Sequence, residues 1–259
     1  MICAGIDAGS RTIKVALLET GTLKVVACGM GDQGVQQEAL AMELLEHLLG
    51  QHGLSRRDVR TIIATGYGRN AIQAADETIT EITCHARGVR HLLPGARTVV
   101  EIGGQDSKLL RLDGDGGVRD FAMNDRCAAG TGRFLEVVAA RLGVDLHELG
   151  AMARRSAKPA AISSMCVVFA ETEIIGLLAA GTPPEDIVAG VQASIAARVC
   201  AMTGRNVAEP VVFTGGVALV PGMAEALQSA LGRPVAIAPQ PQMTGALGAA
   251  LLACAKREA

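Results

Sequence analysis

The sequence predicts an α/β protein on the basis of three observations. A run of strand, glycine turn, strand, turn and strand occurs twice, about a hundred residues apart. Helical patterns dominate the second half of the chain. The 259 residues are 49% hydrophobic, which is enough for two modest lobes or one large domain with a sizeable core. The long period indicates a weak structural duplication and not a short-period solenoid.

The first copy of the pattern predicts four strands and two helices. The strands are expected at 3–6, 12–18, 23–27 and 59–64. The helices are expected at about 35–49, where leucines recur at helical spacing, and at roughly 81–93, which ends before Pro94.

The second copy predicts three strands, and mainly helices follow them. The strands are expected at 98–102, 107–112 and 118–122, with one more at 210–213. The helices are expected at 131–142, 166–180, 183 to about 202, and 244–255. Gly143 and Gly181 follow helix ends, where a left-handed residue commonly stops a helix. The segment 182–185 predicts a capping box with Thr182 as the N-cap residue and Pro183 at the first helical position.

Composition argues against several classes of function. The net charge is −2, aromatic residues make up 2% and tryptophan is absent, so no nucleic-acid partner is expected. The N-terminus lacks the pattern of a signal peptide and the apolar stretches are interrupted, so no membrane span is expected. We therefore expect a cytoplasmic protein whose seven cysteines are mostly reduced thiols or metal ligands. The absence of a CxxC pair argues against a self-contained zinc or ferredoxin-type site.

The first glycine turn lies in the segment DAGSRTIK at 7–14, between two predicted strands. Glycine lets backbone N–H groups approach phosphate oxygens closely. A carboxylate at a strand end, here Asp7, holds Mg²⁺, usually through water. Taken alone, this segment is more simply a plain hairpin, and it is neither a Walker A motif nor a GxGxxG motif.

Two further glycine turns follow strands later in the chain. The second, EIGGQDS at 101–107, offers Glu101 or Gln105 to orient the water that attacks a phosphoryl group. The third, FTGGVA at 213–218, suits close contact with an adenosine. Three such turns in this order are much more specific than any one of them.

In this order the turns resemble those of the superfamily that contains acetate kinase, sugar kinases, heat-shock chaperones and actin. The resemblance implies two actin-like, ribonuclease H-like lobes with a nucleotide cleft between them: 1–95 plus about 240–259, and 96–239. Asp7, Glu101 and Gln105 are the implied catalytic residues, and Asp7 also holds Mg²⁺ through water. The implied nucleotide contacts are Gly9, Ser10, Arg11, Lys14, Gly103, Gly104, Asp106, Gly215, Gly216 and Val217. Glu101 stands where the superfamily usually has Asp, which leaves open which residue positions the hydrolytic water.

The cysteines fall into two groups. Five lie in apolar strands or in helices and fit the role of small buried hydrophobes: Cys3, Cys28, Cys84, Cys200 and Cys254. Cys127 and Cys166 each precede a helix, in the polar or small surroundings 124–126 and 163–165. A helix N-terminus favours a thiolate and so suits redox or metal chemistry, although a structural role stays open. Two cysteines cannot complete a four-thiolate cluster, whereas a symmetric dimer supplies four.

Longer motifs sharpen the resemblance and cover nearly the whole chain. They are ATGYGR at 64–69, VVEIGGQDSK at 99–108, NDRCAAGTGRF at 124–134, CVVFAETE at 166–173 and GALGAA at 245–250. The chain resembles the BadF/BadG/BcrA/BcrD-type ATPase family, and in particular the activators of 2-hydroxyacyl-CoA dehydratases.

This resemblance implies a homodimer bridged by one [4Fe–4S] cluster, with Cys127 and Cys166 of the second lobe as ligands in each subunit. It also implies ATP, ADP and Mg²⁺ as cofactors, and ATP-coupled transfer of a single low-potential electron. The implied donor is a ferredoxin or flavodoxin. The implied acceptor is a dehydratase, in which the electron forms a ketyl radical that permits elimination of water.

Three other functions remain alternatives. An ATPase subunit of a benzoyl-CoA reductase-type or double-cubane-cluster reductase system would share the fold and the cluster. A small-molecule kinase would explain the glycine turns but leave Cys127 and Cys166 without a role. An actin-like scaffold would form filaments with ATP. The identity of the acyl-CoA substrate does not follow from the sequence.

Overall fold

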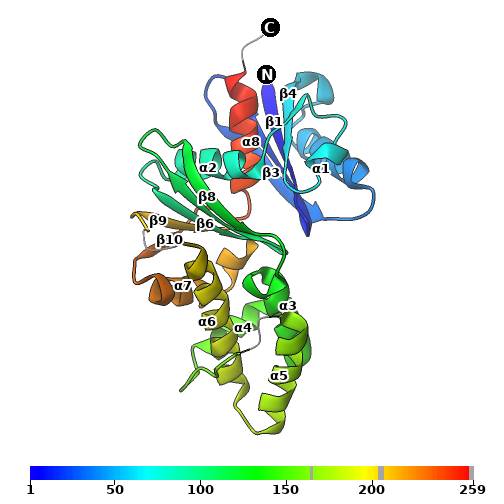
Figure 1. The fold of residues 1–259 in the computed structure, drawn as a ribbon. Coiled ribbons are helices and arrows are strands. Elements are labelled where there is room, and N and C mark those ends of the chain that lie inside the picture. Colours follow the sequence, from blue (N-terminus) through cyan, green and yellow to red (C-terminus); the bar gives the residue numbers. More distant parts are fainter. Residues whose placement is uncertain (164–165, 204–206, 257–259) are drawn as a thin grey trace. The chain divides into compact units, whose positions relative to one another are not determined.

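A computed structural model describes residues 1–163, 166–203 and 207–256 (Figure 1). The chain forms two compact units, each built around one five-stranded sheet. Unit 1 comprises Met1–Gly95, Leu112–Val118 and Gln242–Ala259, and unit 2 comprises Ala96–Arg111 and Arg119–Pro241. The α/β class expected from the sequence is confirmed. Of the residues around Cys166 that the sequence analysis singled out, Ser164 and Met165 lie outside the described residues.

The sheet of unit 1 has the strand order β3-β2-β1-β4-β5. Its strands are β1 (Ile2–Ala8), β2 (Thr12–Glu19), β3 (Val25–Asp32), β4 (Val59–Thr65) and β5 (Glu77–Thr78). β1 pairs antiparallel with β2 and parallel with β4. β3 begins later than expected because Leu23 has φ 58° in the preceding turn, and it continues beyond position 27 because β2 pairs with it as far as Asp32. The two-residue strand β5 was not predicted.

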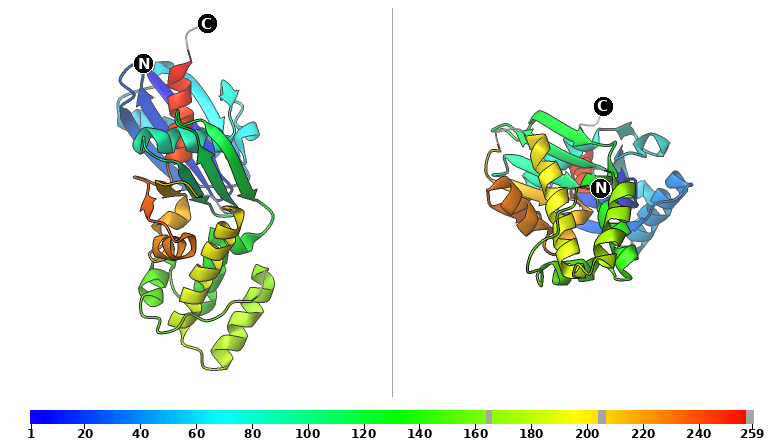
Figure 2. Two further views of the ribbon diagram at one scale, coloured as in Figure 1. Left: turned by 60° about the vertical axis from the view of Figure 1, so that its left-hand side comes forward. Right: turned by 60° about the horizontal axis from the view of Figure 1, so that its bottom comes forward.

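Both faces of β1 are covered, and all seven of its residues are buried. The even-numbered residues, such as Ile6, pack in one cluster with α1 (Gln37–Gln51). The opposite face packs against α8 (Thr244–Ala255), with α2 (Glu81–Leu92) beside α8 (Figure 2). Glycine at position 5 makes this packing close, since a methyl group there would lie 2.1 Å from the Ala246 carbonyl oxygen.

The sheet of unit 2 has the strand order β10-β9-β6-β7-β8. Its strands are β6 (Thr98–Ile102), β7 (Ser107–Leu112), β8 (Val118–Asn124), β9 (Val211–Thr214) and β10 (Val235–Ile237). β6 pairs antiparallel with β7 and parallel with β9, so β6 has the same kinds of neighbour as β1. The strands predicted at 98–102 and 107–112 are confirmed at both ends. β10 was missed because its three residues are too short for a strand pattern.

Five helices accompany this sheet in the described residues. They are α3 (Gly132–Leu142), α4 (Leu146–Ala153), α5 (Val167–Ala179), α6 (Pro184–Thr203) and α7 (Met223–Leu231). The core joins side chains of β6 and β9 to those of α3 and α6, among them Val100, Phe213, Phe134 and Val191. As expected, glycines with positive φ end α3 and follow α5, at 67° and 81°. α4 and α7 were not predicted.

In the part of the chain that the structure describes, no helix combines the length and hydropathy that a membrane span requires.

Candidate nucleotide site and cysteine pair

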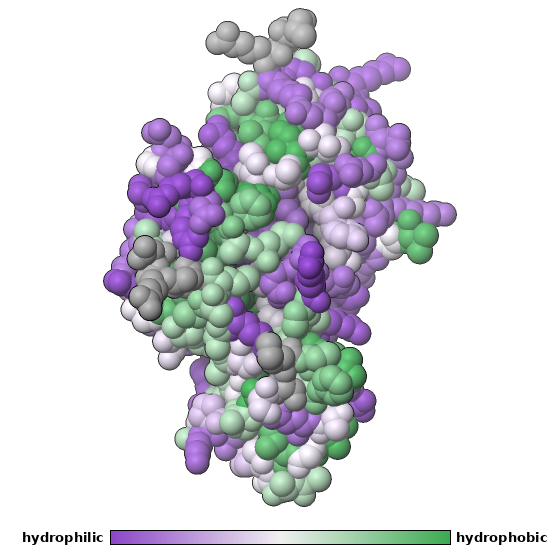
Figure 3. Space-filling model, viewed as in Figure 1, coloured by the Kyte–Doolittle hydropathy of each residue, from purple (hydrophilic) through white to green (hydrophobic). Residues whose placement is uncertain are grey.

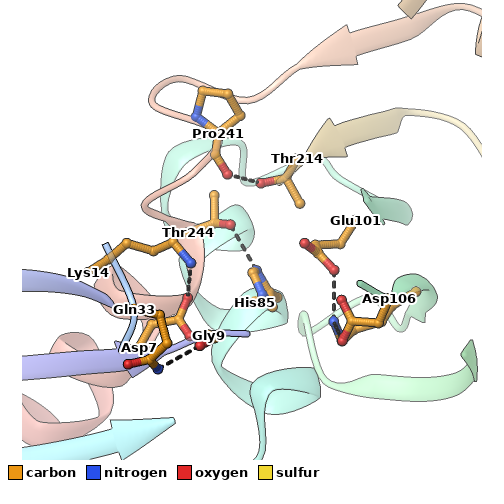
Figure 4. Close-up of polar contacts among 11 residues, drawn as sticks. Asp7, Gly9, Lys14, Gln33, His85, Glu101, Asp106, Thr214, Pro241 and Thr244 are labelled. Carbon is orange, nitrogen blue, oxygen red and sulfur yellow. Dashed lines mark hydrogen bonds and ion pairs between the residues drawn. The ribbon is translucent and has the colours of Figure 1, made fainter. Parts of the chain in front are cut away.

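In unit 1, the β1–β2 hairpin holds an acid and a lysine opposite each other. Asp7 is 4% exposed and pairs in register with Lys14. The Lys14 Nζ donates to Asp7 Oδ2 at 3.3 Å (Figure 4). The Gly9 N–H donates to the Thr12 carbonyl at 3.1 Å and closes the turn, while Gln33 Nε2 donates to the Gly9 carbonyl at 2.8 Å. The turn therefore has one fixed shape beside a buried carboxylate.

Two glycines from distant segments leave room for this carboxylate. Gly66 follows β4, has φ 87°, and a methyl group there would lie 2.4 Å from Asp7 Oδ1. A methyl group at Gly245 would lie 2.8 Å from Asp7 Oδ2. Beside them, His85 Nδ1 and Thr244 Oγ1 are 2.9 Å apart in a buried hydrogen bond (Figure 4). Positive φ is open to glycine at little cost, so the chain conformation and the space at Gly66 both require it.

In unit 2, the β6–β7 hairpin repeats the arrangement. Glu101, also 4% exposed, pairs in register with Lys108. The Lys108 Nζ donates to Glu101 Oε2 at 2.8 Å and to Asp106 Oδ2 at 2.7 Å. The Gly103 N–H donates to the Asp106 carbonyl at 3.0 Å, as Gly9 does to Thr12. In both hairpins the lysine lies seven residues after the acid.

The strand parallel to the one with the acid ends in the same way in both units: β9 beside β6 matches β4 beside β1. Gly215 follows β9, has φ 89°, and a methyl group there would lie 2.6 Å from Glu101 Oε1. The Thr214 Oγ1 and the Gly215 N–H both donate to the Pro241 carbonyl, at 2.6 and 2.9 Å (Figure 4). Each unit thus presents a buried acid, a paired lysine and a positive-φ glycine. Buried backbone and side-chain groups of this kind can bind phosphate oxygens and hydrated Mg²⁺.

The structure places the other predicted nucleotide contacts around these two arrangements. Ser10 and Arg11 lie in the first turn, Gly104 and the exposed Gln105 lie in the second, and Gly216 and Val217 begin the short 3₁₀ helix Gly216–Leu219. Sequence reasoning missed Lys108, Gly66, His85 and Thr244. The repeated spacing of acid, glycine two residues later and lysine seven residues later was the available signal for Lys108.

The Asn124 side chain binds the backbone of Cys127. Asn124, the last residue of β8, accepts from the Cys127 N–H at 3.1 Å and donates from Nδ2 to the Cys127 carbonyl at 2.7 Å. Cys127 precedes one turn of 3₁₀ helix, Ala128–Gly130, and Thr131 is the residue that caps α3. The helix dipole therefore acts on Cys127 less directly than the sequence suggested. Cys166 is itself the N-cap residue of α5 and is exposed.

The start of α3 is bonded to the second glycine turn. The Gly132 and Arg133 N–H groups donate to the carbonyls of Gly103 and Gly104, both at 2.9 Å. Near the other end of α3, Arg141 pairs with Glu171 of α5. One helix thus contacts both the second turn and the helix that begins after Cys166.

Three of the remaining cysteines, Cys28, Cys84 and Cys254, are poorer metal ligands. Burial raises the pKa of Cys84 to about 12 and that of Cys254 to about 12, with a hydrogen bond between Cys254 and Cys3 adding to the second shift. Burial also raises the pKa of Cys28. Within the described ranges, no group of three or more His, Cys, Asp or Glu side chains is placed to hold a metal. Cys127 and Cys166 therefore need donors from outside this chain to form a four-thiolate site.

Comparison with known proteins identifies the family. The model of the BadF/BadG/BcrA/BcrD ATPase family matches residues 4–253. The chain belongs to this family. An activator of lactoyl-CoA dehydratase from Anaerotignum propionicum is 45% identical over 258 residues, which cover 98% of this chain and 97% of the relative.

Solved structures of family members and of more distant proteins agree with this assignment. The activator of the 2-hydroxyisocaproyl-CoA dehydratase from Clostridium difficile, solved with bound ADPNP, has a TM-score of 0.92 and 43% identity, with 98% of this chain and 94% of that chain covered. The ROK hexokinase from Thermus thermophilus has a TM-score of 0.56 at 16% identity, with 98% of both chains covered, and shows the fold alone. The predicted actin-like fold and ATPase class are confirmed.

Proposed function

We propose that this protein is an ATP-dependent activase that passes a low-potential electron from ferredoxin or flavodoxin, through a dimer-bridging [4Fe–4S] cluster, to a 2-hydroxyacyl-CoA dehydratase. The observation that carries the proposal is the pair Cys127 and Cys166, each ahead of a helix in the unit that holds the second glycine turn of an ATPase. The bound cluster supplies one-electron chemistry. The activators among the relatives support the choice of acceptor.

Nucleotide binding is assigned to residues of both units. Asp7 binds Mg²⁺ through water, and Glu101 and Gln105 act on the attacking water. The phosphates contact the first turn, 9–11 with Lys14, and the second turn, Gly103, Gly104 and Asp106. The adenosine contacts 215–217. Two buried carboxylates, each beside a positive-φ glycine, support this assignment. We assign 1–95 with about 240–259 to the first actin-like lobe and 96–239 to the second.

The cysteines fit a cluster shared by two copies. Each copy supplies Cys127 and Cys166, so a symmetric pair of subunits provides four thiolates. Beside Cys166, α5 exposes Val168 and Phe169 at 67% and 70%, and Figure 3 shows hydrophobic surface where Figure 1 draws α5. A contiguous apolar surface beside an exposed ligand supports burial against a second copy.

Hydrogen bonds within unit 2 support a coupling between nucleotide and thiolates. Because Gly132 and Arg133 donate to the carbonyls of the second turn, a change in that turn moves the start of α3. Asn124 fixes the backbone of Cys127 just ahead of it. ATP turnover therefore alters the surroundings of Cys127 through α3, as conformational switching by a nucleotide requires.

The experiment is to purify the protein with strict exclusion of air and to measure native mass, iron and sulfide. We expect a dimer with about four iron and four sulfide per dimer. It should reduce a 2-hydroxyacyl-CoA dehydratase only when ATP and a reduced ferredoxin or flavodoxin are present. A monomer that stays free of iron after reconstitution would overturn the proposal. A stable complex with a permanent reductase partner would instead identify the reductase-type ATPase.

A further inference from the structure

Lys108 is buried and bound by two carboxylates. It is 1% exposed, and its ammonium donates to Glu101 at 2.8 Å and to Asp106 at 2.7 Å. Burying an isolated ammonium is costly, so this group persists inside the unit because the two anions surround it. Its counterpart Lys14 has an exposed side-chain fraction of 15%, against 2% for Lys108, and a longer contact of 3.3 Å with Asp7.

Among the positions at which the two hairpins differ, one bears directly on this contrast. The residue whose carbonyl closes the turn is Thr12 in the first hairpin and Asp106 in the second. The second hairpin therefore carries an additional carboxylate, and Lys108 is the cation that holds it next to Glu101. A turn that served only to fold the chain would not need this added carboxylate, because the first hairpin closes without it.

Lys108 also determines which oxygen of Glu101 can bind another group. The ammonium donates to Oε2, so Oε1 is the oxygen that can accept a further hydrogen bond. Methyl groups at Gly215 and Gly103 would lie 2.6 and 3.2 Å from Oε1, so this oxygen faces the two predicted nucleotide turns across glycine. The bond to Lys108 and the two glycines together leave the Glu101 carboxylate a single orientation.

We propose that Lys108 is a positioning residue for ATP hydrolysis, holding the Glu101 carboxylate so that Oε1 accepts a hydrogen bond from the attacking water. This rests on the assignment of Glu101 in the proposed function. The water oxygen bonds to the γ-phosphorus while the bond from that phosphorus to the ADP oxygen breaks, and the electron pair leaves with ADP. The proton of the water leaves with inorganic phosphate or to solvent. Lys108 acts through Glu101 and does not touch the nucleotide.

The test is a double-mutant cycle on steady-state ATP hydrolysis with Mg²⁺. Lys108→Met should lower kcat about 100-fold, the scale of losing an electrostatic positioning group, and Glu101→Gln should do the same. In the Glu101→Gln background, adding Lys108→Met should cost nothing further, because coupled residues are not additive. The KM for ATP should change by less than about 3-fold in each variant. Lys24→Met, which removes an exposed lysine, is the control and should match the wild type.

Two outcomes would overturn the proposal: an unchanged kcat in Lys108→Met, or an equal loss in the wild-type and Glu101→Gln backgrounds. If Lys108→Met does not fold, the same double-mutant cycle is measured with Lys108→Arg, which keeps the positive charge but moves it away from its native position. Partial recovery of kcat in Lys108→Arg relative to Lys108→Met is expected. If the wild type holds no iron but hydrolyses ATP, the proposed activase function is wrong. The double-mutant cycle can still be interpreted in that case, because it measures only ATP hydrolysis.

Discussion

The backbone N–H of Arg133 donates to the carbonyl of Gly104 at 2.9 Å. This bond joins the first turn of α3 to the second glycine turn, and the Gly132–Gly103 bond beside it has the same length. Amides in the first turn of a helix have no partner within the helix, so they are available to bind a neighbouring loop. Here the two amides lie only a few residues after Cys127, and they bind the loop that we assign to the phosphates. We therefore expect a shift of that loop to reach the segment that carries the cysteine.

Hydrogen exchange should detect this connection. When ADP or a non-hydrolysable ATP analogue binds, the second turn opens less often, so amide exchange at Gly132 and Arg133 should slow by about 10-fold. Mass spectrometry of a peptide spanning 128–140 measures it, and a peptide from α4 is the control. Protection confined to 7–14 and 101–108, with none in 128–140, would contradict a transmitted change.

Substituting either candidate iron ligand, Cys127 or Cys166, should remove the iron, whereas substituting Cys28 should not. Cys127→Ser and Cys166→Ser should each abolish the bound iron and the visible absorption of the cluster, because serine is a poor iron ligand. ADP binding, measured by calorimetry, should stay within about 3-fold of the wild type, since neither thiol belongs to the glycine turns. Cys28→Ser, a part-buried thiol of unit 1, is the matched control and should retain iron. Full iron content in Cys127→Ser would refute its assignment.

Much of the fold and part of the site followed from the sequence, for identifiable reasons. The β6–β7 hairpin was predicted at both strands because short apolar runs, Val99–Val100 and Leu109–Leu110, flank a turn that contains two glycines. Lys108 was missed because its signal lies only in the spacing that it shares with Lys14, seven residues after an acid. Only the strand register places it opposite Glu101. Gly66 and Gly245 were missed because they reach Asp7 from distant segments, and no local pattern reports such a contact.

The exact start of a helix was also difficult to predict from the sequence. Ala128–Gly130 forms a 3₁₀ turn that separates Cys127 from α3, and three small residues give no warning of it. α4 did carry a signal, because Asp145 and Glu148 have the spacing of a capping box, and the Asp145 N–H donates to Glu148 Oε2 at 2.7 Å. With eight residues, α4 is too short for a clear helical period.

Two glycines with almost equal φ should respond differently to alanine. Gly215 has φ 89° and a methyl group there would lie 2.3 Å from the Ile102 carbonyl oxygen and 2.6 Å from Glu101 Oε1. Gly181 has φ 81° with no atom within 4 Å. Gly181→Ala should cost only the backbone strain, about 1–2 kcal/mol. Gly215→Ala adds a backbone clash and should cost about 3 kcal/mol or more and abolish ATP hydrolysis.

Urea denaturation of the two alanine variants measures the difference in stability, and phosphate release measures turnover. Gly181→Ala places alanine at a similar positive φ with no neighbouring atom, so it controls for the positive φ alone, whereas Gly215 also has ψ 173°. Equal losses of stability in both variants, or a fully active Gly215→Ala, would show that the close approach to Glu101 is not required.

Thiol alkylation should separate Cys166 from Cys84 in metal-free protein. The thiolate is the reactive form, and burial raises the pKa of Cys84 to about 12, so at pH 8 only about one molecule in ten thousand carries that thiolate. Cys166 is exposed, and iodoacetamide should label it at least about 100-fold faster than Cys84 under native conditions. Between pH 8 and pH 10 the labelling of Cys84 should keep rising about tenfold per pH unit, because this range lies below its raised pKa. In urea the two rates should converge. Rapid labelling of Cys84 in the native state would show that its thiol is neither buried nor held protonated, and it would return Cys84 to the set of candidate iron ligands.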